Sequence, residues 1–411
     1  MPSTCGLNGR GPAVGRFRNE EGRAMKKIGL LPRILIAIVL GLILGHFLPM
    51  GWVRVFVTFN GVFSQFLGFM IPLIIVGLVT PAIGEVGRGA GRLLLMTVAV
   101  AYLDTALAGL LAYGTGSLFF PSMVEAAQAD VAVAEAQAIE PFFKITIPPL
   151  FDVMSALIFS FVLGLGIAYQ STPQLQALTR EFRDVIAKTI GVAIIPLLPL
   201  YIFGIFLQMV VSGEAYRIVL VFAQIILVIF ILHVVILLYE FVIAGGLTRR
   251  NPLRLLWTML PAYMTALGTS SSAATIPVTL RQTLKNGVSE DIAGFTVPLC
   301  ATIHMSGSAM KITACALTIC LLEGIPHDFL TFLHFILMLG IVMVAAPGVP
   351  GGAIMAALAP LGYILGFTPD QQALMIALYI AMDSFGTACN VTGDGAIALI
   401  IDKWTGLRYR R

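Results

Sequence analysis

The stretch LYIAMDSFGTACNVTGDGAIALIID, residues 378–402, has the apolar composition of a membrane span, yet acidic side chains lie well inside it. Carboxylates inside a bilayer are costly and persist where they line a cavity or bind an ion. The four polar residues Asp383, Thr387, Asn390 and Asp394 are spaced so that they share one face of a helix. The stretch therefore predicts a helix that presents polar groups to a buried site. A polar seam between two helices is the alternative.

The composition identifies a polytopic membrane protein whose surroundings are the lipid bilayer. Of its 411 residues, 58% are hydrophobic and only 11% are charged, about half the charged fraction of a soluble domain. A net charge of +4 gives no reason to expect nucleic acid as a partner. The sequence contains no HExxH, phosphate-binding loop or GxSxG motif, so we do not expect an enzyme.

Six membrane spans are expected in the first 250 residues. Basic residues cluster before the first span, in three of the connecting segments and at the C-terminus, which predicts a multi-pass protein of the cell (inner) membrane with both termini in the cytoplasm. Residues 1–27 are expected to be a cytoplasmic tail, or an extension upstream of a true start at Met25. The six spans are predicted at 28–49, 55–84, 93–119, 153–179, 187–211 and 218–242.

The second half of the chain predicts interrupted segments. Residues 255–280 are uncharged but are broken at Gly268–Ser272, and each arm is too short to cross a bilayer. Residues 329–369 are broken in the same way at Pro347–Gly352. We expect both to be re-entrant helical hairpins, because irregular backbone at membrane depth is tolerated where it lines a cavity. The span at 291–322 is expected to break at 304–308.

Each hairpin is followed by one span, and the two units, 255–322 and 329–402, enter from opposite sides. Such an inverted repeat is typical of ion-coupled transporters with a site near the bilayer midplane. The predicted fold is an all-α polytopic membrane protein with eight transmembrane helices, two re-entrant helical hairpins and an inverted repeat in the C-terminal half. Two kinked ordinary spans are the alternative, but they would place the basic C-terminus outside.

Four motifs carry a resemblance to a known family. They are SSAATIPVTLR (271–281), VSEDIAGFTVPLCATIHMSGSAM (288–310), GVPGGAIM (348–355) and NVTGDGAIALIIDK (390–403). The chain resembles the dicarboxylate/amino acid:cation symporters, the relatives of the glutamate transporters. The resemblance implies a homotrimer and a single transporter domain at 28–405. Its scaffold would comprise residues 28–84 and 150–212, and its moving transport part residues 93–119, 217–245 and 252–405.

The resemblance also implies roles for individual residues. Asp383 would hold a substrate amine, and a sodium ion would bind at Asp394 and Asn390. The substrate-binding residues would be Ser271, Ser272, Gly348, Val349, Pro350, Gly351, Asp383, Thr387 and Asn390. The cation-binding residues would be Tyr102, Asp104, Thr105, His304, Met305, Ser306, Asn390 and Asp394.

Departures from the family pattern concern substrate and coupling. Gly386 stands where acidic-substrate relatives carry an arginine, so a neutral amino acid is expected to compete better than glutamate, unless Lys311 meets the second carboxylate. Ser306 stands where relatives carry an acid. His304 and Lys311 are therefore candidates for proton coupling. An ion pair between Asp104 and Lys311 that only joins two helices is the alternative.

The sequence thus predicts a secondary active symporter for a small carboxylate-bearing solute, an amino acid or a dicarboxylate. An elevator-type movement would be driven by a sodium and/or proton gradient, with no cofactor besides the transported Na⁺ and/or H⁺. An anion channel or a non-transporting receptor on the same scaffold is the alternative, and net accumulation of solute would discriminate between them. His233 and Glu240 are expected to be structural.

Overall fold

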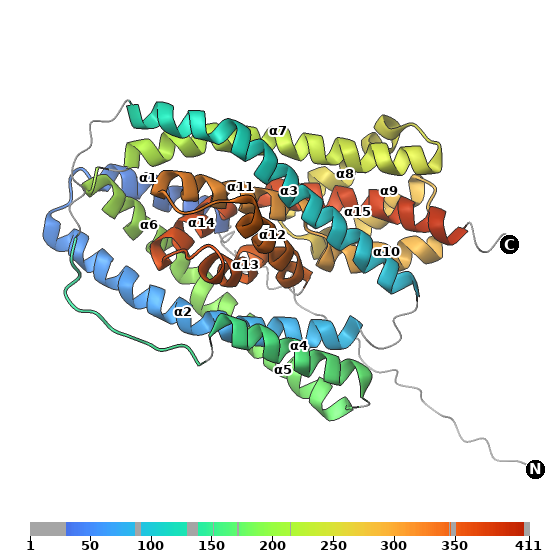
Figure 1. Ribbon diagram of the computed structural model, residues 1–411, viewed down its shortest axis with the longest axis horizontal. Coiled ribbons are helices and arrows are strands. Elements are labelled where there is room, and N and C mark those ends of the chain that lie inside the picture. The colour runs from blue at the N-terminus through green and yellow to red at the C-terminus, as the bar shows by residue number, and fades with distance from the viewer. Residues whose placement is uncertain are drawn as a thin grey trace, which may run out of the picture.

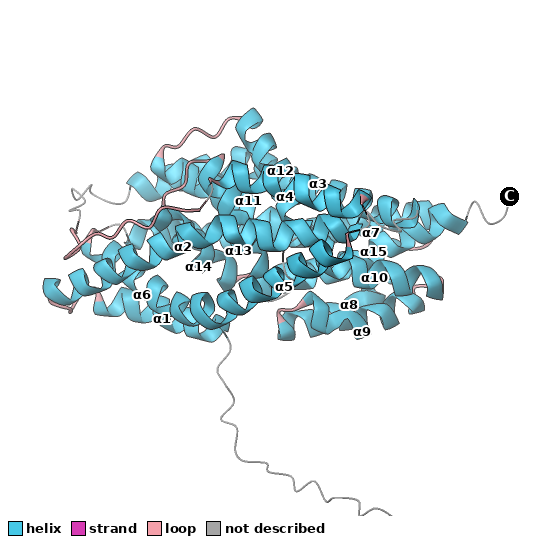
Figure 2. Cartoon of the chain, turned by 90° about the horizontal axis from the view of Figure 1, so that it is seen from below, coloured by secondary structure: helices cyan, strands magenta, loops and turns pink. Residues whose placement is uncertain are grey.

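The architecture is all-helical throughout the part of the chain that the structure describes (Figure 2). This structure is a computed structural model. It describes residues 30–86, 92–129, 139–150, 152–170, 172–213, 215–344, 346 and 351–406. The predicted tail at 1–27 and three residues of the predicted substrate site, Gly348, Val349 and Pro350, lie outside the described residues.

The helices are numbered along the chain, and α5 continues through a π-helical turn, η1, into α6 (Figure 1). Their bounds are α1 Leu30–Leu44, α2 Met50–Val86, α3 Arg92–Ala129, α4 Val153–Tyr169, α5 Pro173–Thr189, η1 Ile190–Ile194, α6 Ile195–Val211, α7 Ala215–Thr248, α8 Pro252–Thr269, α9 Ser272–Lys285, α10 Glu290–Ile303, α11 Ser306–Glu323, α12 Phe329–Val344, α13 Gly352–Tyr363, α14 Pro369–Ala381 and α15 Asp383–Gly406.

Among the described residues, six helical stretches are long and apolar enough to cross a membrane, which makes the chain a multi-pass membrane protein. Eight such spans were predicted. The difference arises because α1 and the apolar part of α4 are shorter than the roughly 20 residues that a bilayer requires. The six stretches are Met50–Pro81, Arg92–Glu125, Pro173–Val211, Ile218–Thr248, Glu290–Glu323 and Asp383–Gly406.

The predicted end of the fourth span is wrong. α4 ends at Tyr169 rather than at residue 179, and a new helix begins at Pro173. Proline favours the first turn of a helix, where its missing N–H has no partner to lose. α5 is amphipathic and polar on one face, and only Thr179 and Ile186 are buried along it. The basic residues between 180 and 188 therefore lie on a helix and not in a loop between two spans.

The predicted interruption near residue 270 is present, and its turn is short. α8 ends at Ser270, whose φ of 50° lies in the left-handed region. Ser271 then caps α9, because its hydroxyl accepts a hydrogen bond from the backbone N–H of Ala274. The two helices pack against each other. The Ser-rich tip thus satisfies one of the free N–H groups at the start of α9.

Two further breaks lie in the interior. α10 and α11 are separated by His304 and Met305, as predicted for the 304–308 segment. The prediction of one continuous helix over 378–402 is wrong, because α14 ends at Ala381 and α15 begins at Asp383, with Met382 between them in a non-helical conformation. Each break frees backbone N–H and C=O groups inside the protein, and polar side chains gather at both.

α15 lies in the middle of the C-terminal half and is coloured red in Figure 1. It packs against α7, α8, α9, α10 and α11. Nearly all of its residues are buried, including Asn390 and Asp394. α3 packs along α11, whereas α2 packs against α4, α5 and α6. The polar face predicted from the sequence is therefore enclosed by helices and not by lipid.

Close packing of α2 on α4 predicts a sharp difference between two glycines of α4. A Cβ atom at Gly164 would lie 2.7 Å from Cβ of Ile83 and 3.0 Å from the carbonyl oxygen of Thr80, whereas a Cβ at Gly166 would meet nothing within 4 Å. Gly164→Ala should lower the free energy of unfolding by about 1–3 kcal/mol, the usual cost of overpacking. Gly166→Ala, the matched control, should be neutral or stabilising by up to about 1 kcal/mol. Equilibrium unfolding in detergent measures both, and equal effects would contradict this packing.

Candidate functional site

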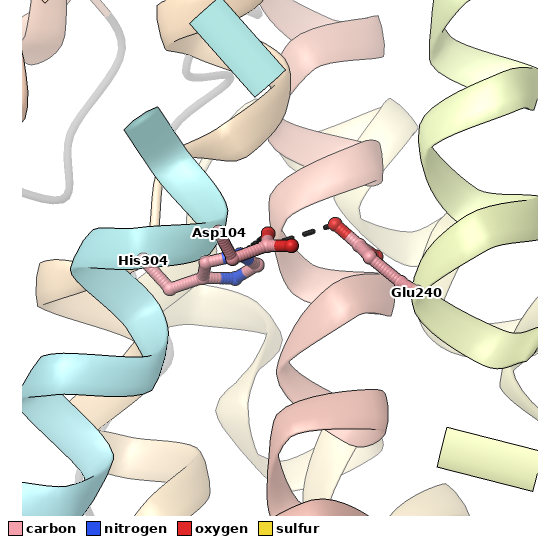
Figure 3. Close-up of side chains that lie close together, drawn as sticks. All are labelled: Asp104, Glu240 and His304. Carbon is pink, nitrogen blue, oxygen red and sulfur yellow. Dashed lines mark hydrogen bonds and ion pairs between the residues drawn. The ribbon is translucent and has the colours of Figure 1, made fainter. Parts of the chain in front are cut away.

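His304 is the centre of a buried polar cluster at the break between α10 and α11. Its Nδ1 lies 2.9 Å from Oδ1 of Asp394 on α15, and its Nε2 lies 2.8 Å from Oδ2 of Asp104 on α3. The His304 and Asp394 side chains are 0% and 1% exposed. Figure 3 shows the ring beside Asp104, with Glu240 approaching from α7. The cluster joins residues that are far apart in the sequence.

The geometry fixes how many protons the three residues share. A ring nitrogen without hydrogen and an ionised carboxylate oxygen are both acceptors, so each contact needs one hydrogen between its two atoms. Asp104, His304 and Asp394 therefore hold two protons together. Either the ring is an imidazolium between two carboxylates, or it is neutral and one carboxylic acid donates to it. In both cases the trio carries one net negative charge.

Glu240 belongs to this cluster, although we expected it to be structural. Its Oε1 accepts a hydrogen bond of 3.0 Å from the Ser306 hydroxyl and lies 4.0 Å from Nε2 of His304. Ligand atoms of Asp104, Glu240 and His304 all lie within 4.8 Å of one another, so they could surround one small cation. The signal available in the sequence was an acid inside an apolar span.

Two of the predicted cation-site residues, Tyr102 and Thr105, stand close to Asp104 in the sequence. The Tyr239 hydroxyl donates a 2.8 Å hydrogen bond to Oδ1 of Asp104. Thr105 accepts a hydrogen bond of 3.3 Å from the backbone N–H of Met305 and so ties α3 to the break. Tyr102 points elsewhere, because its hydroxyl donates to the carbonyl of Leu337 on α12. The structure thus brings Asp104 and Thr105 to the cluster, but not the Tyr102 hydroxyl.

Asn390 organises the start of α11. Its Oδ1 accepts hydrogen bonds from the backbone N–H groups of Gly307 at 2.9 Å and Ser308 at 3.3 Å. Its Nδ2 donates to the Ser308 hydroxyl at 3.2 Å. These are N–H groups that a helix start leaves unpaired. Asn390 and Asp394, one turn apart on α15, therefore hold the break from the same side.

Lys311 and Asp383 form a second buried pair. The Lys311 ammonium lies 3.4 Å from Oδ1 of Asp383 and 3.3 Å from the carbonyl oxygen of Met382. Asp104 pairs instead with His304, so the alternative of an Asp104–Lys311 ion pair is wrong. The reason is topological, since Lys311 faces the break between α14 and α15 while Asp104 faces the break between α10 and α11.

One residue from each predicted hairpin tip, Gly351 and Ser270, contacts the start of α15. Oδ2 of Asp383 accepts a 2.9 Å hydrogen bond from the backbone N–H of Gly351, just before α13. The hydroxyls of Ser270 and Ser384 are 2.6 Å apart, which ties the tip between α8 and α9 to the start of α15. Ser272 and Thr387 are buried nearby on these helices. Of the predicted substrate residues in the described part, Gly351 and Asp383 thus meet at the start of α15, whereas Asn390 lies at the α10–α11 break.

Both clusters lie within the part of the chain that matches a known family. The model of the sodium:dicarboxylate symporter family matches residues 30–404. The chain belongs to that family. It is therefore a membrane transporter of the symporter type, and the matched region includes both polar clusters and both tips.

Two glycines of α15 make room for charged groups of this transporter. A Cβ at Gly393 would lie 2.5 Å from Oε2 of Glu240 and 2.7 Å from Cε1 of His304. A Cβ at Gly386 would lie 2.6 Å from Nζ of Lys311. Lys311 therefore brings its ammonium to position 386 from α11, which is the alternative that the sequence left open for this position.

The pairing of the charges predicts which substitutions are coupled. Asp104→Asn and His304→Asn remove the same hydrogen bond, so their effects on the free energy of unfolding should be non-additive by about 0.5–3 kcal/mol. Asp104→Asn and Lys311→Met share no partner and should add to within about 0.5 kcal/mol. Equilibrium unfolding of the single and double variants in detergent measures both cycles. Coupling in the second cycle and additivity in the first would contradict the structure.

Proposed function

We propose that this transporter is a secondary active symporter for a small carboxylate-bearing solute, an amino acid or a dicarboxylate, driven by a sodium and/or proton gradient. The observation that carries the proposal is the buried cluster of His304 with the carboxylates of Asp104, Glu240 and Asp394. The solute would bind at the tips and at Asp383, and the coupled cation at the cluster. Asp383 and Asp394, which mark these two positions, lie on the same polar face of α15.

Electrostatics supports a cation at the cluster. No lysine or arginine of the described residues is hydrogen-bonded to its three carboxylates, so only the protons shared with His304 offset their charge. Transferring uncompensated charge out of water costs several kcal/mol per ion. A bound sodium ion or an additional proton would offset that charge. The loaded cluster would then be the form that moves through the membrane, which is what ties solute movement to the gradient.

Asn390 supports a coupling between the cation cluster at His304 and the solute position at Asp383. It holds the N–H groups at the start of α11, and Ser308 in turn contacts the Tyr379 hydroxyl at 3.0 Å. Tyr379 lies beside Lys311, whose ammonium is 3.6 Å from its ring centroid. A short path of hydrogen bonds and one cation–π contact thus runs from the α10–α11 break to the α14–α15 break. A cation bound at one end would stabilise the geometry at the other.

The wider arrangement is also proposed by analogy with the family. α3, α7 and α8 to α15 would form a moving part, and α1, α2, α4, α5 and α6 a scaffold that assembles as a homotrimer. The movement would be of the elevator type. Both termini would face the cytoplasm in the cell membrane, as the basic flanks of the spans favour. The clustering of both polar sites on one side of this division supports it.

Asp394→Asn provides the most direct test of the coupling site. It removes the charge that His304 Nδ1 contacts while preserving size. Losing a hydrogen bond to a charged group, worth about 1.5–3 kcal/mol, should lower solute uptake roughly 10- to 100-fold. Uptake of radiolabelled solutes into proteoliposomes is measured with a sodium gradient alone, a proton gradient alone, and both together.

Asp402→Asn is the matched control, because this carboxylate lies at the far end of α15 and accepts hydrogen bonds from Ser289 instead. It should retain uptake. Wild-type uptake by Asp394→Asn would refute the role of Asp394. Solute that only equilibrates and never accumulates against its own gradient would favour the channel alternative.

A further inference from the structure

Lys311 carries a fully buried ammonium, with a side chain that is 0% exposed. A buried ammonium is strongly unfavourable unless it is paired. Three groups around the α14–α15 break compensate it: the Asp383 carboxylate, the Met382 carbonyl and the face of the Tyr379 ring. These three contacts fix the position of the Lys311 ammonium.

Both carboxylate oxygens of Asp383 already have a partner in this arrangement. Its Oδ1 faces the Lys311 ammonium and its Oδ2 accepts from the Gly351 N–H. Among the described residues it is also the carboxylate that contacts the tip before α13. Any solute ammonium bound between the tips would therefore have to approach Asp383 and compete with Lys311 for it.

Gly386 completes the arrangement from α15. Nζ and Cε of Lys311 lie 2.6 and 2.9 Å from the place where a Cβ of residue 386 would be. Contacts this short are not made by real Cβ atoms, so a larger residue at 386 requires the end of the lysine side chain to move. The glycine thus leaves the space that the end of the lysine side chain occupies.

We propose that Lys311 is a tethered cation that fills the solute-ammonium position at Asp383 and thereby decides which solutes are accepted. This inference rests on the proposed function. A solute that carries its own ammonium meets a position already taken and is repelled by a like charge. A carboxylate solute without an ammonium finds Asp383 neutralised, and the Lys311 ammonium is within reach as a hydrogen-bond donor. This preference departs from our expectation of a neutral amino acid.

Succinate and aspartate are a suitable pair of probes, because they differ by one ammonium group. The test is the uptake of each solute into proteoliposomes, together with the thermal stabilisation of the detergent-purified protein by each solute. Wild type should favour succinate. Lys311→Met, which keeps the length of the side chain and removes its charge, should shift the succinate-to-aspartate ratio at least tenfold toward aspartate. Lys285→Met removes an exposed charge from α9 and should leave the ratio unchanged.

Lys311→Met leaves the buried Asp383 carboxylate without its charged partner, which favours misfolding. Two further variants therefore test the same inference. Lys311→Met/Asp383→Asn removes both charges and should bring the ratio close to one. Gly386→Ala displaces the ammonium and should shift the ratio in the same direction as Lys311→Met. Gly294→Ala, where a Cβ meets nothing within 4 Å, is its control and should not shift the ratio.

The outcomes separate this inference from the proposed function. An unchanged ratio in Lys311→Met and in Gly386→Ala, with uptake retained, would overturn the role of Lys311 and leave the symporter intact. A wild-type preference for aspartate would overturn it as well. Failure of the wild type to accumulate any amino acid or dicarboxylate under either gradient would overturn the proposed function, and the role of Lys311 with it.

Discussion

The constraint on which the structure depends is that a carboxylate inside an apolar helix bundle must meet a positive charge or a proton. Asp383 and Asp394 stand on one buried helix, and each has its own partner, Lys311 and His304. Both partners come from the α10–α11 segment. In the interior of the C-terminal half, α15 is thus paired with the α10–α11 segment through these two contacts, and the other helices pack around them.

The same constraint explains why the helices break where they do. An unbroken helix offers a buried ion only side chains, whereas a broken one also offers N–H and C=O groups. The Met382 carbonyl contacts Lys311, and the N–H groups of Gly307 and Ser308 contact Asn390. Backbone groups at the breaks therefore contribute contacts to both sites.

Much of this arrangement could be predicted from the sequence, because its signals are local. Charge-free runs indicated most of the helices, and Gly268–Ser272 and His304–Ser308 marked breaks that the structure contains. The sequence could not predict which buried charged residues contact one another. Asp104 was weighed as a partner of Lys311, and Glu240 was set aside, since nothing in spacing tells which residues meet across about 200 positions of chain. Helix ends within apolar runs, such as Tyr169 and Ala381, also escape pattern reasoning.

Gly386 has a consequence for how solute preference is assigned among related sequences. Read one position at a time, a glycine there looks like the loss of a cation from the solute site. In space the positive charge is still present, since Lys311 delivers it to the same point from a different helix. Residues 311 and 386 therefore describe a single chemical feature, and the charge at this point cannot be inferred from either residue alone.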